Sequence, residues 1–226
     1  MYVHPAFQID RATALSFAAA RGFGTFVTCA KGRPVASALP FLLSYAANGA
    51  PVIEFHVARA NALAAIAEND GKWLLAVAGA DTYVSPDWYA SPDQVPTWLY
   101  ESVHLSGSGR VMSPARLAVH LDRLTEKFES WLAPKPPWEP NQVSPGRYKM
   151  LSKAIVGIEM EVETVEGSFK LNQHKSDADH AAIAQALSQQ ENKDARYLSE
   201  RMIALRPHLD YDTAAPRPAT NLEGAM

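Results

Sequence analysis

The chain has 226 residues, 47% of them apolar and 20% charged, which is the composition of an ordinary globular protein rather than a disordered or fibrous one. With 21 basic and 24 acidic residues the formal net charge is −3, so the chain as a whole has no basic character that would draw it to nucleic acid. The single cysteine excludes an intramolecular disulfide, and charges interrupt every apolar run before it could span a membrane. We therefore expect a cytoplasmic protein without a membrane segment.

The first quarter of the chain predicts one helix followed by three strands. Asp10 and Gly22 are a suitable N-cap and C-terminal stop for a helix over 11–21. Asn48-Gly49 is the strongest short turn signal in the sequence and favours a hairpin. The strands, rich in β-branched and aromatic residues, are expected at 23–30, 34–43 and 51–57. Three strands in succession predict an antiparallel meander.

The middle of the chain continues this β-rich pattern. A short helix is expected at 60–68, a strand at 72–78 and a long strand at 97–112, in which Gly107 and Gly109 indicate a bulge or bend. A helix then begins at Ser113-Pro114. Its apolar residues stand at helical spacing and are expected to face the core: Leu117, Leu121, Leu124, Phe128 and Trp131.

The last third of the chain predicts a connector, one strand and two helices. Five prolines within 134–145 favour an extended connector there. A strand is expected at 154–165, with a turn at Glu166-Gly167, and helices at 177–189 and 194–205. The whole pattern is mainly β (α+β), an antiparallel barrel with flanking helices and C-terminal helices. We expect a single domain over 1–206 and a loosely ordered tail over 207–226.

The densest concentration of chemistry lies between residues 83 and 104. It holds five aromatic residues and three polar ones: Tyr83, Trp88, Tyr89, Trp98 and Tyr100, with Ser85, Thr97 and His104. Burying one such ring removes roughly 150–250 Å² from water, so the segment is either a packing element or a surface for a planar ligand. On a strand that starts at Thr97, the residues Trp98, Tyr100, Ser102 and His104 share one face.

Two further segments have side chains suited to an anionic ligand. One joins the end of a strand to the start of a helix and would either hold a phosphate or be a solvated helix start; the other follows the turn at 166–167. Their polar residues are His56, Arg59 and Asn61 in the first and Lys170, Gln173 and Lys175 in the second. The sequence has no phosphate-binding loop, no dinucleotide-binding glycine motif and no nucleophile elbow. No catalytic residue can be assigned, and no metal site is expected.

Several multi-residue motifs occur in a fixed order along the chain. They are Met1-Tyr2 with Pro5 and Phe7, Leu39-Pro40-Phe41, His56-x-Ala-Arg-Ala-Asn61, Tyr83-Val-Ser-Pro-x-Trp-Tyr89, Val95-Pro-Thr-Trp-x-Tyr100-x-x-Val-His104, Ala154-Ile-Val-Gly157, and Glu166-Gly-x-Phe-Lys-Leu171 with Gln173 and Asp179. With these motifs the chain resembles, over nearly its whole length, the PaiB-type family of FMN-binding transcriptional regulators.

The resemblance implies a split-barrel fold similar to that of pyridoxamine-phosphate oxidase, a homodimer, and FMN bound between the two subunits. In that arrangement Arg59 and Lys170 would supply charge for the phosphate, and Trp98 and Tyr100 would form part of the wall for the ring. The full set of cofactor-binding residues that it implies is His56, Arg59, Asn61, Tyr83, Ser85, Trp88, Tyr89, Thr97, Trp98, Tyr100, His104, Lys170 and Gln173.

The chain departs from the family pattern at three places. Leu99 stands where the family has asparagine, Asn172 and His174 interrupt the run after Lys170-Leu171, and Gly79-Ala80-Asp81 replaces Gly-Pro-His. A buried hydrogen-bonding group left without its partner costs about 1–3 kcal/mol. The departures at Leu99, Asn172 and His174 therefore predict a weakened hold on FMN in an unchanged fold.

Three functions remain open at this point. The chain is a flavin-binding regulator or flavin-dependent redox protein, a dimeric regulatory module that has lost its flavin, or a split-barrel heme-binding protein that uses a histidine such as His104 or His208. The two C-terminal helices carry balanced charges, so they are expected to be poor readers of DNA. Their charged residues are Lys175, Lys193, Arg196, Arg201 and Arg206 against Asp177, Asp179, Glu191, Asp194 and Glu200.

Overall fold

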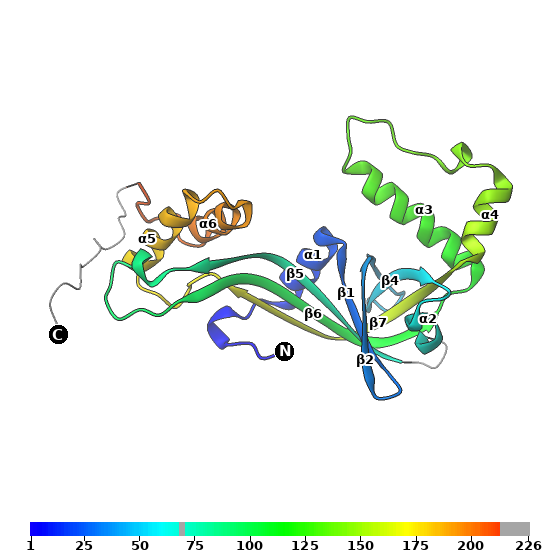
Figure 1. Cartoon of the computed structure of the whole chain (residues 1–226), viewed down its shortest axis with the longest axis horizontal. Helices are drawn as coiled ribbons and strands as arrows, with labels where there is room; N and C mark the ends of the chain where they lie inside the picture. Colours follow the sequence, from blue (N-terminus) through cyan, green and yellow to red (C-terminus); the bar gives the residue numbers. More distant parts are fainter. Residues whose placement is uncertain (68–70, 213–226) are drawn as a thin grey trace, which may run out of the picture. The chain divides into compact units, whose positions relative to one another are not determined.

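The computed structural model describes residues 1–67 and 71–212, and within it the chain divides into two compact units. Unit 1 comprises 1–10, 78–102 and 167–212, and unit 2 comprises 11–77 and 103–166. Three long strands, β5 (Lys72–Val84), β6 (Thr97–Val111) and β7 (Ile155–Lys170), pass from one unit into the other (Figure 1). The expectation of a single domain over 1–206 stays a prediction, and the tail from 213 lies outside the described residues.

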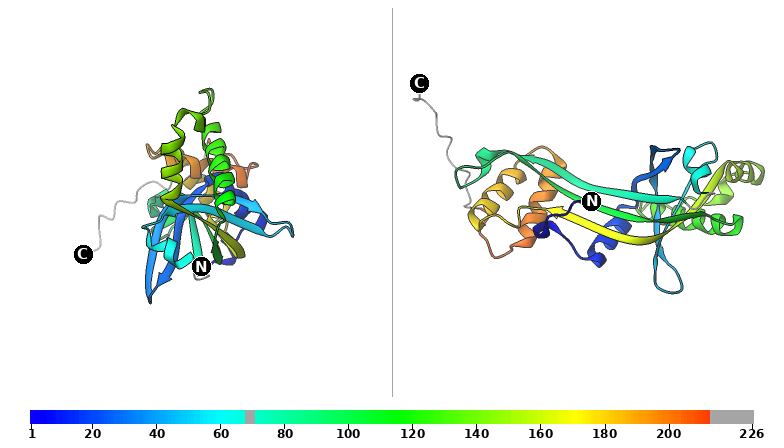
Figure 2. Two further views of the ribbon diagram at one scale, coloured as in Figure 1. Left: turned by 90° about the vertical axis from the view of Figure 1, so that its right-hand side faces the viewer. Right: turned by 90° about the horizontal axis from the view of Figure 1, so that it is seen from below.

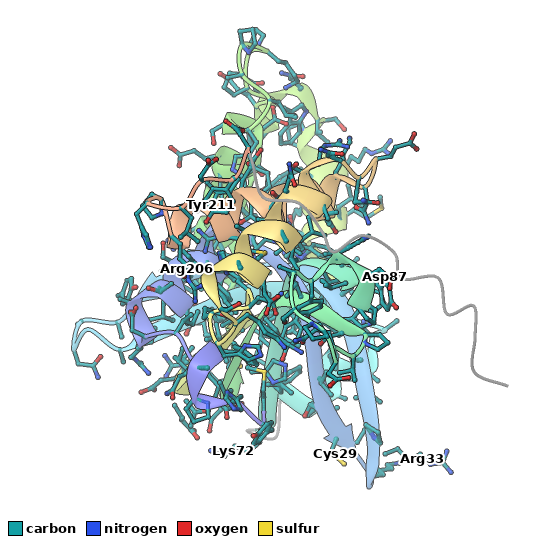
Figure 3. All side chains as sticks on the ribbon, turned by 90° about the vertical axis from the view of Figure 1, so that its left-hand side faces the viewer. Cys29, Arg33, Lys72, Asp87, Arg206 and Tyr211 are labelled. Carbon is teal, nitrogen blue, oxygen red and sulfur yellow. The ribbon has the colours of Figure 1, made fainter. Side chains whose placement is uncertain are left out.

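The strands form one antiparallel sheet in the order β2-β1-β5-β6-β7-β4-β3. The other four belong to unit 2: β1 (Phe23–Ala30), β2 (Arg33–Pro40), β3 (Leu42–Tyr45) and β4 (Pro51–Ala58). The hairpin expected at Asn48-Gly49 is present as β3 and β4, and β1 pairs with β2 in another hairpin. Cys29 and Arg33 flank the turn of the first hairpin (Figure 3).

The predicted meander is wrong, because the expected strand over 34–43 is two strands that belong to opposite ends of the sheet order. The break is at Phe41, whose side chain is completely buried and whose N–H donates to the carbonyl oxygen of Gly22 at 2.8 Å. Pro40 has no N–H for a sheet, so the ladder with β1 ends there. The buried ring of Phe41 then redirects the chain into β3.

Aromatic side chains fill the core of unit 2. The rings of Phe26 and Phe55 stack with centroids 3.8 Å apart, Phe41 meets Phe26 edge-on, and Trp73 meets Phe55 in the same way. The expected first helix is confirmed as α1 (Arg11–Arg21), followed by Gly22 at φ 58°. The next helix is α2 (Ala62–Ala67); the predicted residue Glu68 lies outside the described residues.

Two predictions about the later strands are wrong at their ends. The strand expected to stop at 78 continues as β5 to Val84, and β7 continues straight through the predicted turn at Glu166-Gly167 to Lys170. The reversal comes instead at Asn172, which has φ 58°, a conformation that asparagine tolerates. The long strand β6 is confirmed, with Leu99, Glu101, Val103 and Leu105 buried on one face.

Helix α3 (Pro114–Ser130) begins as predicted, with the Ser113 hydroxyl accepting a hydrogen bond from the N–H of Arg116. The prediction that its apolar stripe faces the core is wrong. None of the stripe residues is buried, Trp131 is 56% exposed, and His120 is the buried residue of this helix. Polar side chains of α3 make the buried contacts with the sheet, as described below.

The proline-rich segment contains one helical turn, and a helix that the sequence analysis did not predict begins at its end. A short 3-10 turn, η3 (Pro140–Gln142), precedes α4 (Pro145–Lys153). Ser144-Pro145 opens α4 with the same residue pair that opens α3, and this repeated signal could have predicted it. Figure 2 shows α3 and α4 lying side by side.

Unit 1 contains the remaining helices. Two one-turn segments, η1 (Pro5–Phe7) and η2 (Pro86–Trp88), lie in its connecting regions, and the expected C-terminal helices are confirmed as α5 (Asp177–Ser188) and α6 (Lys193–Leu205). Helices α5 and α6 pack together (Figure 1). Beyond α6, the Tyr211 hydroxyl donates to the carbonyl oxygen of Arg206 at 3.0 Å (Figure 3). No helix among the described residues has the length and apolarity needed to span a bilayer.

Candidate functional site

In unit 1 one face of the sheet formed by β5, β6 and β7 is covered by α6. Glu101 on β6 is buried, and its Oε1 accepts a hydrogen bond from Arg201 Nε of α6 at 3.0 Å. The Arg201 guanidinium also lies over the ring of Phe169 on β7, 5.8 Å from its centroid. Because strand side chains alternate between faces, the neighbours of these two residues point away from α6. Those neighbours include Tyr100 on β6 and Lys170 on β7.

The face opposite α6 presents aromatic rings to solvent. Trp98 is 53% exposed and Tyr83 of β5 is 44% exposed, and their rings meet edge-to-face with centroids 6.2 Å apart. Tyr100 follows on the same face of β6 and is half-buried. Large exposed aromatic side chains that gather on one surface are typical of a ligand or partner site. We call Tyr83, Trp98, Tyr100 and Lys170 the open-face cluster.

Positive groups gather around Lys170. Lys170 Nζ donates to the hydroxyl of Thr97 at 2.6 Å and lies 5.7 Å from the ring centroid of Phe7, which His174 meets edge-on. Burial and the nearby Lys175 lower the pKa of Lys170. Burial, Lys175, Lys170 and His4 lower the pKa of His174 in the same way. Since the described residues provide no ion pair for Lys170, a bound anion would relieve this repulsion.

The aromatic loop between β5 and β6 is held to α5 by a buried carboxylate. Asp179 is 4% exposed, and its two oxygens accept hydrogen bonds from the N–H and the hydroxyl of Ser91, both at 2.8 Å. Although burial raises the pKa of Asp179, the hydrogen bonds from Ser91 and Ser176 and the charge of Lys175 outweigh burial and lower it. Lys175 also donates to Gln94 of the loop at 2.7 Å.

Replacing Asp179 with asparagine is expected to loosen the aromatic loop. The charge-assisted bonds to Ser91 would weaken, and we expect a loss of about 1–3 kcal/mol in the free energy of unfolding. Hydrogen exchange at the amides of 90–95 should accelerate in the variant. Asp177→Asn is the matched control, because the Asp177 side chain is 62% exposed. Equal exchange in both variants would contradict the proposed anchoring role.

Three predicted site residues of this region are occupied by structural contacts. The side chain of Tyr89 is buried, with Lys175 Nζ 4.9 Å from its ring centroid, and burial followed by Asp179 raises its pKa. Gln173 uses its amide to close the turn after β7, accepting from Leu171 N–H and donating to the Phe169 carbonyl. The Ser85 hydroxyl caps η2, at whose end Trp88 is half-buried.

Two of the residues that depart from the family pattern, Leu99 and Asn172, are buried, whereas His174 and Asp81 are exposed. Leu99 is completely buried and, one residue from Trp98, points to the α6 side of β6. Asn172 is also completely buried; it lies beside Tyr89 and lowers that pKa slightly, although neither of its amide atoms has a hydrogen bond of normal geometry. A ligand on the open-face cluster would therefore not touch Leu99.

The remaining predicted site residues belong to unit 2. Arg59 donates through Nε and Nη2 to the carbonyl oxygens of Lys153 and Ile155, both at 3.2 Å. Asn61 accepts from Leu63 N–H at the start of α2 and donates to the Ser37 hydroxyl. Burial lowers the pKa of His104, a half-buried residue of β6.

His56 belongs to a buried polar network that the sequence analysis missed. Its Nδ1 lies 3.2 Å from His120 Nε2 of α3, and burial followed by His120 lowers the pKa of His56 to about 4. The centre of the network is Glu54 on β4, whose carboxylate contacts Arg116 at 2.6 Å, Arg123 at 3.1 Å and the hydroxyl of Ser44. His120 Nδ1 lies 3.7 Å from Glu54 Oε2, too far for a hydrogen bond. A polar stripe at helical spacing, from Arg116 through His120 to Arg123, was the available signal.

The described residues contain no group of three or more histidine, cysteine, aspartate or glutamate side chains placed to hold a metal ion.

Unit 2 has a cavity of about 530 Å³ between α1 and β3, with Leu15, Leu43 and Tyr45 among its lining residues. None of the predicted cofactor-binding residues lines this cavity.

Comparison with known proteins identifies the family. Residues 1–164 match the family described as "Putative FMN-binding domain". Over 203 residues the chain is 30% identical to the Bacillus subtilis protein named protease synthase and sporulation protein PAI 2, covering 89% of this chain and 96% of that one.

Solved structures show the same fold at low sequence identity. The FAD and heme binding protein from Mycobacterium smegmatis has a TM-score of 0.53 and 16% identity, covering 72% of this chain and 73% of its own. The flavocytochrome Anf3 from Azotobacter vinelandii has a TM-score of 0.51 and 18% identity, covering 71% and 67%. The predicted antiparallel split β-barrel with flanking helices is thereby confirmed, and the chain belongs to the PaiB-type family of FMN-binding domain proteins.

Proposed function

We propose that this chain binds FMN on the open-face cluster of unit 1. The observation that carries the proposal is the contrast between the two faces of this sheet: α6 covers one, and the other presents the half-exposed Tyr83–Trp98 pair. Lys170 is hydrogen-bonded to Thr97, the residue that precedes Trp98. The rings suit the planar flavin, and the positive groups around Lys170 suit the phosphate. When bound, FMN would supply electron-transfer chemistry that no side chain of the cluster offers.

The residues of the cluster would position the cofactor. Thr97 holds the ammonium group of Lys170, which can donate further hydrogen bonds to phosphate oxygens. The pKa of His174 is lowered, so this residue would be neutral at neutral pH and would gain a proton more readily beside a phosphate. The Asp179–Ser91 contacts would fix the loop that precedes Trp98.

A second copy of the chain would cover the exposed ring of Trp98 in the state that binds FMN. Large aromatic residues at the centre of an interface are commonly those that contribute most to its stability. We therefore propose a homodimer with FMN at its interface, acting as a regulator or as a flavin-dependent redox protein. Light scattering of the purified full chain is expected to give twice the chain mass.

The test is a titration of FMN with the full chain, in which quenching of the flavin fluorescence measures binding. Stacking on an aromatic ring is worth about 1–3 kcal/mol, so Trp98→Leu should weaken FMN binding roughly tenfold or more. Lys170→Gln should do the same through loss of a charge-assisted hydrogen bond worth about 1.5–3 kcal/mol. The matched controls are Trp131→Leu, because Trp131 is 56% exposed on the other unit, and Lys149→Gln.

The spectrum of the purified protein separates the alternatives. Flavin bands that disappear in Trp98→Leu but persist in Trp131→Leu support the proposal. Unchanged FMN affinity in both Trp98→Leu and Lys170→Gln would overturn the placement on this face. A protein that takes up no flavin is a flavin-free module, and a Soret band would indicate heme binding, which the name of the Mycobacterium smegmatis neighbour states.

A further inference from the structure

Helices α3 and α4 of unit 2 enclose an apolar groove. It has a volume of about 320 Å³, within the range of small ligand pockets. The side from α3 includes Leu117, Ala118 and Leu121, three residues of one helical face. These leucines belong to the stripe expected in the core, and neither of them is buried.

The side from α4 gives the groove a positive rim. Lys149 and Lys153 line it together with Tyr148, and no acidic residue is among its lining residues. From Pro140 to Lys153 the chain has three basic residues and no acidic one, the third being Arg147. Within 1–67 and 71–212 none of these three side chains makes an ion pair, so their charges are available to a partner.

The shape and charge of the groove together define its occupant. A flat membrane surface would meet the ridges of the two helices and could not reach Leu117 and Leu121 between them. The apolar floor offers no hydrogen-bonding or charged group to a nucleic-acid backbone, which is bound through charge and hydrogen bonds. A helical peptide with an apolar stripe and flanking carboxylates fits both features, since its stripe would enter the groove and its acidic groups would meet Lys149 and Lys153.

We propose that the α3–α4 groove is a docking site for an acidic amphipathic helix of a partner protein. This site is independent of the open-face cluster, because all of its residues belong to unit 2. It gives the protein a means of recognising a partner through charge and apolar contact at once. The flavin and the partner would then occupy separate surfaces.

The test uses the full chain and a fluorescein-labelled peptide of about 15 residues, long enough to form a helix on binding. Its leucines stand at positions i, i+3, i+4 and i+7, and glutamates fill the other positions. Fluorescence anisotropy should show binding that weakens with added salt. A peptide of the same composition with its leucines shuffled, and one with lysine in place of glutamate, should each bind at least roughly tenfold more weakly.

Variants then locate the site. The double variant Lys149→Glu/Lys153→Glu changes only exposed side chains and should weaken peptide binding roughly tenfold or more. Lys31→Glu, on the turn of the first hairpin, is the control that should bind like the wild type. Leu121→Asp should also abolish binding, and its circular dichroism melting curve shows whether it remains folded.

Several results would overturn the proposal. Unchanged peptide binding in Lys149→Glu/Lys153→Glu would show that the groove is not the site, as would equal binding of the lysine peptide. Sedimentation with anionic phospholipid vesicles or with duplex DNA, lost in the same double variant while the peptide fails to bind, would assign the surface to that partner instead. A concentration-dependent mass that Leu121→Asp reduces would assign it to a second copy. FMN affinity is unaffected in all of these variants if both proposals hold.

Discussion

Gly107→Ala is expected to lower the stability of the protein more than any other single methyl addition in β6. A Cβ at this position would lie 1.8 Å from the backbone carbonyl oxygen of Glu161 on β7, closer than any real contact. The obstacle is a backbone, so no side-chain rotation can make room, and β6 and β7 would have to separate. We expect a loss at or above the upper end of the about 1–3 kcal/mol typical of overpacking.

Chemical denaturation of Gly107→Ala measures this loss directly. Gly146→Ala is the matched control, because a Cβ there would meet nothing within 4 Å and alanine suits the first turn of α4. The control should be as stable as the wild type or slightly more stable. If Gly107→Ala denatured at the wild-type midpoint, the claim that β6 approaches β7 too closely for a side chain at residue 107 would be contradicted. In that case the bulge or bend predicted at Gly107 would be the better explanation of this glycine.

Glu54→Gln is expected to release α3 from the sheet. The carboxylate of Glu54 is completely buried and is shared by Arg116 and Arg123, so its loss leaves two guanidinium groups without their counter-charge. Breaking a buried ion pair costs about 3–5 kcal/mol. Both arginine side chains are 40% exposed and can reach water, so we expect a loss of about 2–3 kcal/mol in the free energy of unfolding.

The same carboxylate predicts how stability depends on pH. Burial raises the pKa of Glu54, but His120, Ser44, Arg123 and Arg116 outweigh burial and bring it down to about 2 from the usual 4.5. As the pH falls, Glu54 is therefore protonated in the unfolded chain before it is protonated in the folded one. The stabilisation by Glu54 is complete above about pH 4.5 and is lost as the pH falls toward 2. In Glu54→Gln this part of the acid destabilisation should disappear from the denaturation midpoints.

The control for Glu54 is an exposed ion pair of the same unit. Glu163 pairs with Lys72 at 2.7 Å, and their side chains are 49% and 72% exposed. An exposed pair contributes less than about 1 kcal/mol, so Glu163→Gln should be close to the wild type. If the two glutamine variants lost equal stability, the Glu54 network would have no special role in holding α3.

Much of the fold could be predicted from local sequence signals. Asp10, Gly22 and Asn48-Gly49 act within a few residues of the chain, and the helix, stop and turn that they predict are all present. The alternation of β6 was predicted correctly because one face of that strand is buried along its length. The ordered motifs also indicated the family, because several of them occurring in one order are more specific than any single pattern.

The errors arose where long-range contacts override a local pattern. The turn expected at Glu166-Gly167 is part of a strand. A glycine marks a turn in some sequences and, in others, a strand position that a neighbouring backbone approaches closely. The stripe on α3 was assigned to the core because apolar spacing favours burial, but the charge of Glu54 holds the polar stripe of the same helix against β4. Periodicity shows that a helix has two faces; the partner decides which face is buried.

At the candidate site, too, local patterns were predicted correctly and long-range contacts were not. The sequence alone indicated the aromatic residues and Lys170 as candidate ligand contacts, and it predicted that Trp98 and Tyr100 share a strand face. The tertiary structure showed which face α6 covers, and hence that Trp98 is exposed while Leu99 is buried. It also committed Arg59, Asn61 and Gln173 to contacts within their own units. Alternation along a strand is a local property, whereas burial of a face depends here on a helix that comes about 100 residues later in the chain.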